Sequence, residues 1–172
     1  MLDNVNTLEP IRIHETNIAP LAPPRIAVGP PLLIFGLGRR YQDTNAGIMS
    51  QWADFAPHLG HIPGQVGGTT YGVIHNTSDS GEFDYVCGVE VKEFPADPPE
   101  FTRLRIPPHK YAVFEHREHI SVIAATFKRI RDHGLADAGL TPDNAPAFER
   151  YDERFNPRSG TGGLEIWAPI KG

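Results

Sequence analysis

A pattern of one strand, one helix and two strands occurs twice along this chain. Apolar runs and alternation predict the strands, and apolar residues three or four positions apart predict the helices. The first set comprises strands over 32–41, 69–76 and 83–91 and a helix over 48–55, with Thr44 or Asn45 as its N-cap. The second set comprises a strand over 103–116 interrupted at Pro107-Pro108, strands over 147–155 and 164–170, and a helix from 120 that ends at Gly134.

The spacing between the two sets predicts a duplicated fold. Tyr71 and Glu90 are 19 positions apart, and so are Phe148 and Trp167, while Tyr71 and Phe148 are 77 positions apart. A fixed offset between like elements indicates duplication. We therefore predict an α+β fold of two strand–helix–strand–strand units about a pseudo-twofold axis. It would have an antiparallel sheet, two main helices and a ligand cleft between the halves.

Glycine and proline occur 17 times each in the 172 residues, which favours short elements and many turns over a long helical bundle. Six of the prolines fall in residues 1–31, where they fix φ and remove backbone donors. This stretch is predicted to be a leader with one short strand near 11–15, followed by a single domain over 32–172. It contains no helix-turn-helix pattern, so we do not expect the chain to read DNA by itself.

Charge and special residues narrow the classes of protein further. The net charge is −5 and no basic patch is segregated, which disfavours nucleic-acid binding. Cys87 is the single cysteine and is expected to be a buried thiol in a reducing compartment.

The absence of an 18-residue apolar run and of a signal peptide predicts a cytoplasmic location without membrane insertion. His116 and His119 match no metal-binding spacing, and neither a metal nor another cofactor is expected.

Five segments resemble, in order and spacing, the GyrI-like family, which is the effector-binding domain of many AraC-type and MerR-type transcription regulators. They begin at Tyr71, Phe83, Ile106, Phe148 and Glu165 and read Tyr-Gly-Val, Phe-Asp-Tyr-Val-Cys-Gly-Val-Glu-Val, Ile-Pro-Pro-His-Lys-Tyr-Ala-Val-Phe, Phe-Glu-Arg-Tyr-Asp-Glu-Arg-Phe and Glu-Ile-Trp-Ala-Pro-Ile. The resemblance covers about 32–171. Its implied fold is the duplicated unit that the spacing predicts independently.

The resemblance implies a site for lipophilic cations around one acidic residue, which is Glu149 in the Phe-Glu-x-Tyr segment. A carboxylate among apolar walls loses hydration, and an organic cation relieves that cost by pairing with it. Aromatic faces add to the attraction. The expected ligand-binding residues are Glu149, Tyr111, Tyr71, Trp52, Trp167, Tyr151 and Glu90. The alternative for the aromatic residues is an ordinary place in the core, and for Glu149 a salt bridge to Arg154.

The resemblance thus predicts a non-enzymatic module that sequesters a lipophilic, cationic small molecule or signals through another chain. Some stand-alone GyrI-like proteins are described as hydrolases of cyclopropane-type toxins, which would use Glu149 as general base and Tyr111 as hydrogen-bond donor. The family name also suggests a protein-interaction module of the gyrase-inhibitor type. A homodimer or a partner regulator chain is compatible with each of these alternatives.

Overall fold

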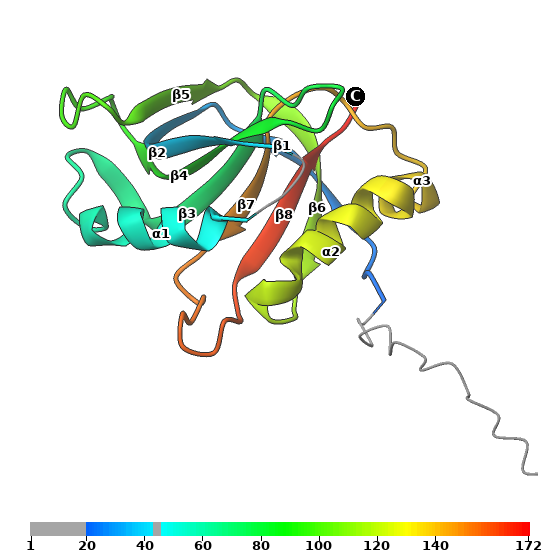
Figure 1. Cartoon of the computed structure of the whole chain (residues 1–172). Coiled ribbons are helices and arrows are strands. Elements are labelled where there is room, and N and C mark those ends of the chain that lie inside the picture. Colours follow the sequence, from blue (N-terminus) through cyan, green and yellow to red (C-terminus); the bar gives the residue numbers. More distant parts are fainter. Residues whose placement is uncertain (1–19, 43–45) are drawn as a thin grey trace, which may run out of the picture.

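The structure, a computed structural model, describes residues 20–42 and 46–172, which form one antiparallel sheet of eight strands (Figure 1). The strands are β1 (Arg25–Gly29), β2 (Leu32–Tyr41), β3 (Gln65–His75), β4 (Phe83–Val91), β5 (Thr102–Ile106), β6 (His109–His116), β7 (Ala147–Tyr151) and β8 (Leu164–Pro169). Their order across the sheet is β1-β6-β8-β7-β3-β4-β2-β5.

The two main helices lie on the same side of the sheet (Figure 1). α1 (Ile48–Phe55) packs on β2 and β4, and a 3-10 turn (Ala56–His58) follows it. A 3-10 turn (Ile120–Val122) leads into α2 (Ile123–Arg129), which continues through a π-helical stretch (Ile130–Gly134) into α3 (Leu135–Asp137). Within the described ranges, no helix is long and apolar enough to span a membrane.

These elements confirm the predicted α+β class, the antiparallel sheet and the two main helices. Three strands of each predicted unit occupy opposite halves of the sheet in mirror order, as β6-β8-β7 and β3-β4-β2, whereas β5, predicted as part of the second unit, lies beside β2. This order is the one that two units joined at β7 and β3 would produce. The duplication and the pseudo-twofold axis stay predictions.

Two hydrophobic clusters fill the space between the helices and the sheet, on what we call the helix face. Under α1, Phe55 packs with Phe35 and Val89. Under α2, Ile130 packs with Phe114 and Ile166. Burying one such side chain stabilises the fold by roughly 1.5–3 kcal/mol, so these clusters fix the positions of both helices on the sheet.

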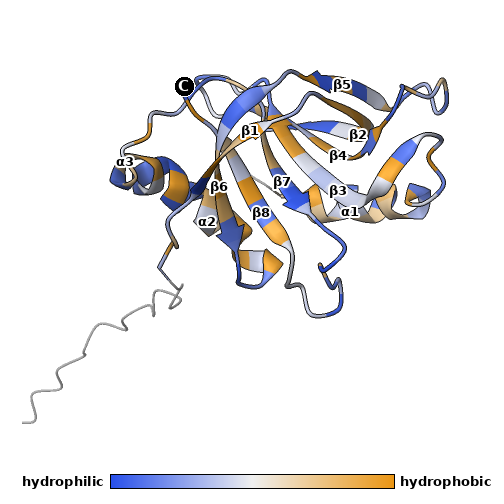
Figure 2. Cartoon of the chain, turned by 180° about the vertical axis from the view of Figure 1, so that it is seen from behind, coloured by the Kyte–Doolittle hydropathy of each residue, from blue (hydrophilic) through white to orange (hydrophobic). Residues whose placement is uncertain are grey.

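We call the opposite face the inner face. Its side chains pack against one another because a short connection holds the two ends of the sheet close together. β1 forms one edge and β2 lies beside the other edge, yet only Pro30 and Pro31 separate them. The three residue steps from Gly29 to Leu32 reach about 11 Å even when extended, so the sheet must curl. The enclosed cluster contains Leu32, Tyr111 and Phe148, and hydrophobic residues run along the strands in Figure 2.

The predicted strand over 103–116 is two strands in the structure. Proline has no backbone N–H to continue a ladder, so the chain leaves the sheet at Pro107-Pro108. β5 pairs with β2, whereas β6 pairs with β1 and β8 in the other half of the sheet. The strand predicted over 147–155 ends at Tyr151, because the Asp152 carboxylate accepts the backbone N–H of Arg154 and starts a turn.

The predicted helix end at Gly134 is wrong. Gly134 has a helical φ of −59°, and the helical path continues through α3. It ends at Gly139, whose φ is +71°. There the N–H groups of Gly139 and Leu140 donate to the carbonyls of Ala136 and Leu135, which is the Schellman pattern. A left-handed glycine, and not any glycine near a helix, marks the end.

Three predictions concern the first part of the chain. The strand near 11–15 and the N-caps Thr44 and Asn45 lie outside the described residues. α1 follows Gly47, which has a left-handed φ of 99° and makes no side-chain cap. The structure adds β1 within the stretch predicted as a leader, paired along its whole length with β6. The domain boundary after residue 31 stays a prediction.

Candidate ligand site

Glu149 lies at the centre of the sheet, on the helix face. In β7 it is paired with Gly72 of β3 on one side and with Ile166 of β8 on the other. Its side chain is only 5% exposed. A Cβ on Gly72 would lie 2.2 Å from the Tyr85 hydroxyl and 2.7 Å from Oε2 of Glu149. The missing side chain at Gly72 therefore creates the space in which these two groups meet.

Two tyrosine hydroxyls donate to the same oxygen of Glu149. Tyr85 Oη lies 2.9 Å from Oε2, and Tyr151 Oη lies 2.5 Å from it. Trp52 of α1 donates its indole N–H to the Tyr85 hydroxyl at 2.9 Å. The rings of Trp52 and Tyr151 meet edge to face, with centroids 5.4 Å apart. Glu149 thus sits at the end of a hydrogen-bonded cluster of three aromatic residues.

Burial dominates the electrostatics of this cluster. Desolvation raises the pKa of Glu149 to about 7, although the hydrogen bonds from Tyr151 and Tyr85 oppose the rise. Desolvation and the nearby Glu149 also hold the pKa values of Tyr85 and Tyr151 well above their ordinary range, so both hydroxyls keep their protons and donate. Cys87 is fully buried, and desolvation raises its pKa far above that of a reactive thiol.

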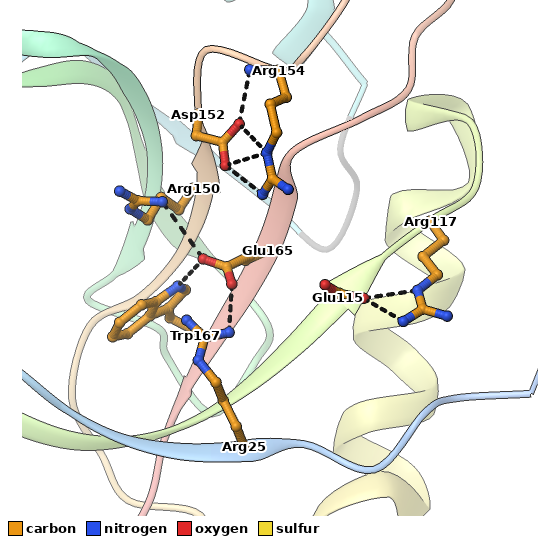
Figure 3. Close-up of polar contacts among 8 residues, drawn as sticks. All are labelled: Arg25, Glu115, Arg117, Arg150, Asp152, Arg154, Glu165 and Trp167. Carbon is orange, nitrogen blue, oxygen red and sulfur yellow. Dashed lines mark hydrogen bonds and ion pairs between the residues drawn. The ribbon is translucent and has the colours of Figure 1, made fainter.

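The alternative of a salt bridge from Glu149 to Arg154 does not hold. The Arg154 guanidinium pairs with Asp152, with 2.7 Å between Nη2 and Oδ2, and it is exposed to solvent (Figure 3). Among residues 20–42 and 46–172, no Lys, Arg or His pairs with Glu149. A buried carboxylate without a cationic partner is costly to ionise, and this cost is what the raised pKa reflects.

The structure does not bring all predicted site residues into one cleft. Trp52 and Tyr151 lie with Glu149 on the helix face. Four others line a cavity of the inner face, on the far side of the sheet: Tyr71, Tyr111, Trp167 and Glu90. The register of the strands explains this division. Val113, Trp167 and Phe148 are cross-strand partners, so their side chains share the inner face. Glu149 is the next residue after Phe148 in β7, so its side chain points to the opposite, helix face.

Tyr85 is the site residue that sequence reasoning missed. It lies in a segment used for the resemblance, but alternation within one strand does not say which strand stands opposite. The available signal was Gly72, a glycine inside a predicted strand, which often marks a close approach of other groups. The structure shows that the approaching groups are Tyr85 and Glu149.

A family model described as GyrI-like small molecule binding domain matches residues 22–171. The chain belongs to the GyrI-like family. The matched residues include every strand and helix of the described structure. No group of three or more His, Cys, Asp or Glu side chains that could hold a metal occurs in the described part of this GyrI-like domain.

Individual relatives agree with this assignment. The transcriptional regulator BrlR of Pseudomonas aeruginosa is 34% identical over 151 residues, which are 85% of this chain and 54% of that protein. The chain therefore spans about half the length of the curated relative that it matches. This match places the GyrI-like domain within a regulator in that relative.

Solved structures show the same fold at low sequence identity. SAV2435 bound to tetraphenylphosphonium has a TM-score of 0.68 at 18% identity, covering 88% of this chain and 95% of that one. The C-terminal domain of EcmrR has a TM-score of 0.57 at 15% identity, covering 86% of this chain and 96% of that one. The GyrI-like fold is thus common to proteins whose sequences have diverged widely.

Proposed function

We propose that this GyrI-like domain binds a lipophilic organic cation on its helix face, with Glu149 as the counter-charge. The observation that carries the proposal is a carboxylate that is 5% exposed and has no cationic partner among the described residues. Both tyrosine hydroxyls donate to Oε2. Oε1 accepts no hydrogen bond from the described residues, so it is available to a ligand.

The chemistry of the surroundings favours a cation that carries its own apolar surface. Such a cation replaces lost hydration by direct pairing with Glu149 and buries apolar area at the same time. Trp52, Tyr85 and Tyr151 offer aromatic rings around the carboxylate, and each cation–π contact adds about 0.5–2 kcal/mol. A strongly hydrated metal or ammonium ion would gain less free energy from pairing with Glu149, because it would have to give up its own hydration.

In this proposal a movement of Trp52 opens the way to Glu149. Glu149, Tyr85 and Tyr151 are all buried, whereas Trp52 is partly exposed. Trp52 comes from α1, a helix of only eight residues. The ligand enters by displacing the indole, which breaks its hydrogen bond to Tyr85 and leaves the two tyrosine donors on Glu149 in place.

One solved structure supports this choice of ligand, and one relative supports a role in regulation. SAV2435, which shares the fold, was solved with bound tetraphenylphosphonium, a lipophilic cation. BrlR, which shares the family, is a transcriptional regulator. A domain of this kind would report the presence of its ligand to a regulator chain, or would sequester the ligand.

Calorimetric titration with tetraphenylphosphonium at pH 8 tests the proposal. We expect the wild-type protein to bind it, and Glu149→Gln to bind it at least about tenfold more weakly, since a charge-assisted contact contributes about 1.5–3 kcal/mol. Glu153→Gln, an exposed glutamate four positions along, is the matched control and keeps the wild-type affinity. Triphenylphosphine oxide, which is neutral, should bind weakly to all three proteins. Equal affinity in wild type and Glu149→Gln would exclude Glu149 as the counter-charge.

The pKa of about 7 at Glu149 favours hydrolysis as a second candidate function. A carboxylate with this pKa is a competent general base near neutral pH. It would take a proton from water while the water oxygen bonds to a ring carbon and a ring carbon–carbon bond breaks. The carbon that leaves would take the proton of a tyrosine, and the proton on Glu149 would then return to that tyrosine. Tyr85 and Tyr151 stand beside Glu149, whereas Tyr111 lies on the other face. Incubation with an electrophilic cyclopropane tests this, and ring-opened product no faster than in buffer would exclude it.

A further inference from the structure

The inner face contains a cavity of about 370 Å³ that the helix-face site does not use. Its lining includes Gly29 and Pro30, where the chain passes from β1 to β2. Glu149 is not among its lining residues. The volume is near the lower end of the range for small-molecule sites, which suits a ligand of metabolite size.

Aromatic rings form the apolar part of the cavity. Phe148 stacks on Trp167 with centroids 5.2 Å apart, and Tyr111 meets both rings edge to face at 5.3 Å and 5.5 Å. Tyr71 meets Phe148 edge to face at 5.7 Å. These contacts hold the four rings in fixed orientations, and all four residues line the cavity. Such a surface is suited to a single aromatic ring of a ligand.

Tyr111 adds an unsatisfied polar group to this apolar surface. The residue is 1% exposed, and its hydroxyl has no hydrogen-bond partner among the described residues. Burial raises its pKa to about 12, so the hydroxyl stays protonated and can donate. Buried polar groups in folded proteins nearly always have partners. The hydroxyl is closed off in the free protein, so a small shift of the Tyr111 ring would let a polar group of a ligand supply the missing partner.

The charged groups of the cavity divide into two unequal sets. Glu165 lies between two arginines, 2.5 Å from Arg25 and 3.6 Å from Arg150, and accepts the indole N–H of Trp167 at 3.3 Å (Figure 3). This set carries one excess positive charge. Glu90 has neither a hydrogen bond nor an ion pair within the described residues, although it lines the same cavity. The cavity lining thus contains a set of side chains with an excess positive charge and a carboxylate without an ion pair, and both Arg150 and Glu90 lie near Tyr71.

We propose that this inner-face cavity binds a small aromatic zwitterion of the amino-acid type. The ammonium group pairs with Glu90, the carboxylate pairs with Arg150, and the ring lies against Trp167 and Phe148. Arg150 is the arginine with the longer contact to Glu165, so it can turn to a ligand while Arg25 keeps Glu165 paired. The excess positive charge of Arg25 and Arg150 over Glu165 disfavours a lipophilic cation here.

Titration of the wild-type protein at pH 7.4 with L-phenylalanine and two analogues tests the charge pattern. We expect L-phenylalanine to bind. Phenethylamine, which lacks the carboxylate, and hydrocinnamic acid, which lacks the ammonium group, should each bind at least about tenfold more weakly. Absence of L-phenylalanine binding up to a concentration of about 10 mM, or equal binding of either analogue, would overturn the proposal.

Substitutions locate the site. Glu90→Gln and Arg150→Gln should each weaken L-phenylalanine binding about tenfold or more, and Tyr111→Phe about twofold to tenfold. The matched controls are Glu115→Gln in β6 and Arg117→Gln just after it, which form an exposed ion pair outside the cavity lining (Figure 3). Circular dichroism checks the fold of each variant. Unchanged affinity in both Glu90→Gln and Arg150→Gln, or displacement of L-phenylalanine by tetraphenylphosphonium, would overturn a separate inner-face site.

Discussion

At the scale of single residues, Glu149 links the stability of the fold to its proposed activity. Its carboxyl group is buried among aromatic residues, and its pKa of about 7 in the folded protein exceeds the value of 4.5 for an ordinary glutamate. Folding therefore favours the protonated acid, and ionisation within the fold is costly. A bound cation offsets this cost, so the destabilising feature of the free protein is also the source of affinity.

The stability of the protein should fall as pH rises through the window from about 4.5 to about 7. Below 4.5 Glu149 is protonated in both states, and above 7 its full cost applies, up to about 3 kcal/mol at 1.4 kcal/mol per unit of pKa. Glu149→Gln removes the pH dependence of stability that comes from this carboxyl group. Urea unfolding at pH 5 and pH 8 measures the difference between wild type and variant, with Glu153→Gln as control. The same pH dependence in all three proteins would contradict the raised pKa.

A second residue-scale feature is the glycine opposite Glu149. Gly72→Ala places a Cβ within 2.2 Å of the Tyr85 hydroxyl and 2.7 Å of Glu149 Oε2. We expect a loss of stability of about 1–3 kcal/mol and weaker binding of the lipophilic cation, because both side chains must shift. Gly68→Ala is the control on the same strand, since its Cβ meets only the exposed side chain of Glu153. Wild-type stability and affinity in Gly72→Ala would contradict the close approach.

At the scale of secondary-structure elements, β1 decides whether the inner face is closed. Its residue Ala27 packs on the inner cluster, and Gly29 lies against the ring of Tyr111. Its outward residues Ile26 and Val28 are 49% and 76% exposed. The strand is short, Pro-flanked and apolar on both sides, so its sequence lacks the alternation that predicts an edge strand, and composition alone indicated a leader.

Chains that begin at residue 20 and at residue 31 test the role of β1. The second lacks the strand that pairs with β6 and covers Tyr111. We expect its melting temperature to be lower by on the order of 5 °C or more, since lost pairing and lost burial each cost a few kcal/mol. It should also lose L-phenylalanine binding, because Arg25, Gly29 and Pro30 line the cavity. Equal melting temperatures would show that the domain is complete without β1.

At the scale of the whole molecule, sequence reasoning predicted the elements better than their mutual placement. Period and turn residues correctly indicated α1, the antiparallel class and the strands from β2 onward, with β5 and β6 predicted as one interrupted strand, but they missed β1. Alternation correctly placed Glu149 and Tyr151 on one face of β7. It could not place Tyr111 relative to them, because that requires the register of β6, β8 and β7 across the sheet. Register depends on long-range packing, and one sequence does not show it.

The two faces of the curled sheet therefore offer two different environments. The helix face holds a carboxylate without a described cationic partner, under a short helix that carries Trp52. The inner face holds an aromatic cavity with arginines and glutamates. One sheet separates them, and adjacent residues of β7, Glu149 and Arg150, point to opposite faces.

Proton release on ligand binding tests the central claim most directly. If the lipophilic cation binds ionised Glu149, whose pKa is about 7 in the free protein, then at pH 6 each bound cation displaces about one proton. At pH 8.5 the number falls to about zero, and Glu149→Gln releases none at either pH. Calorimetric titrations with tetraphenylphosphonium in two buffers of different ionisation enthalpy measure this number. Binding without proton release at pH 6 would contradict the account.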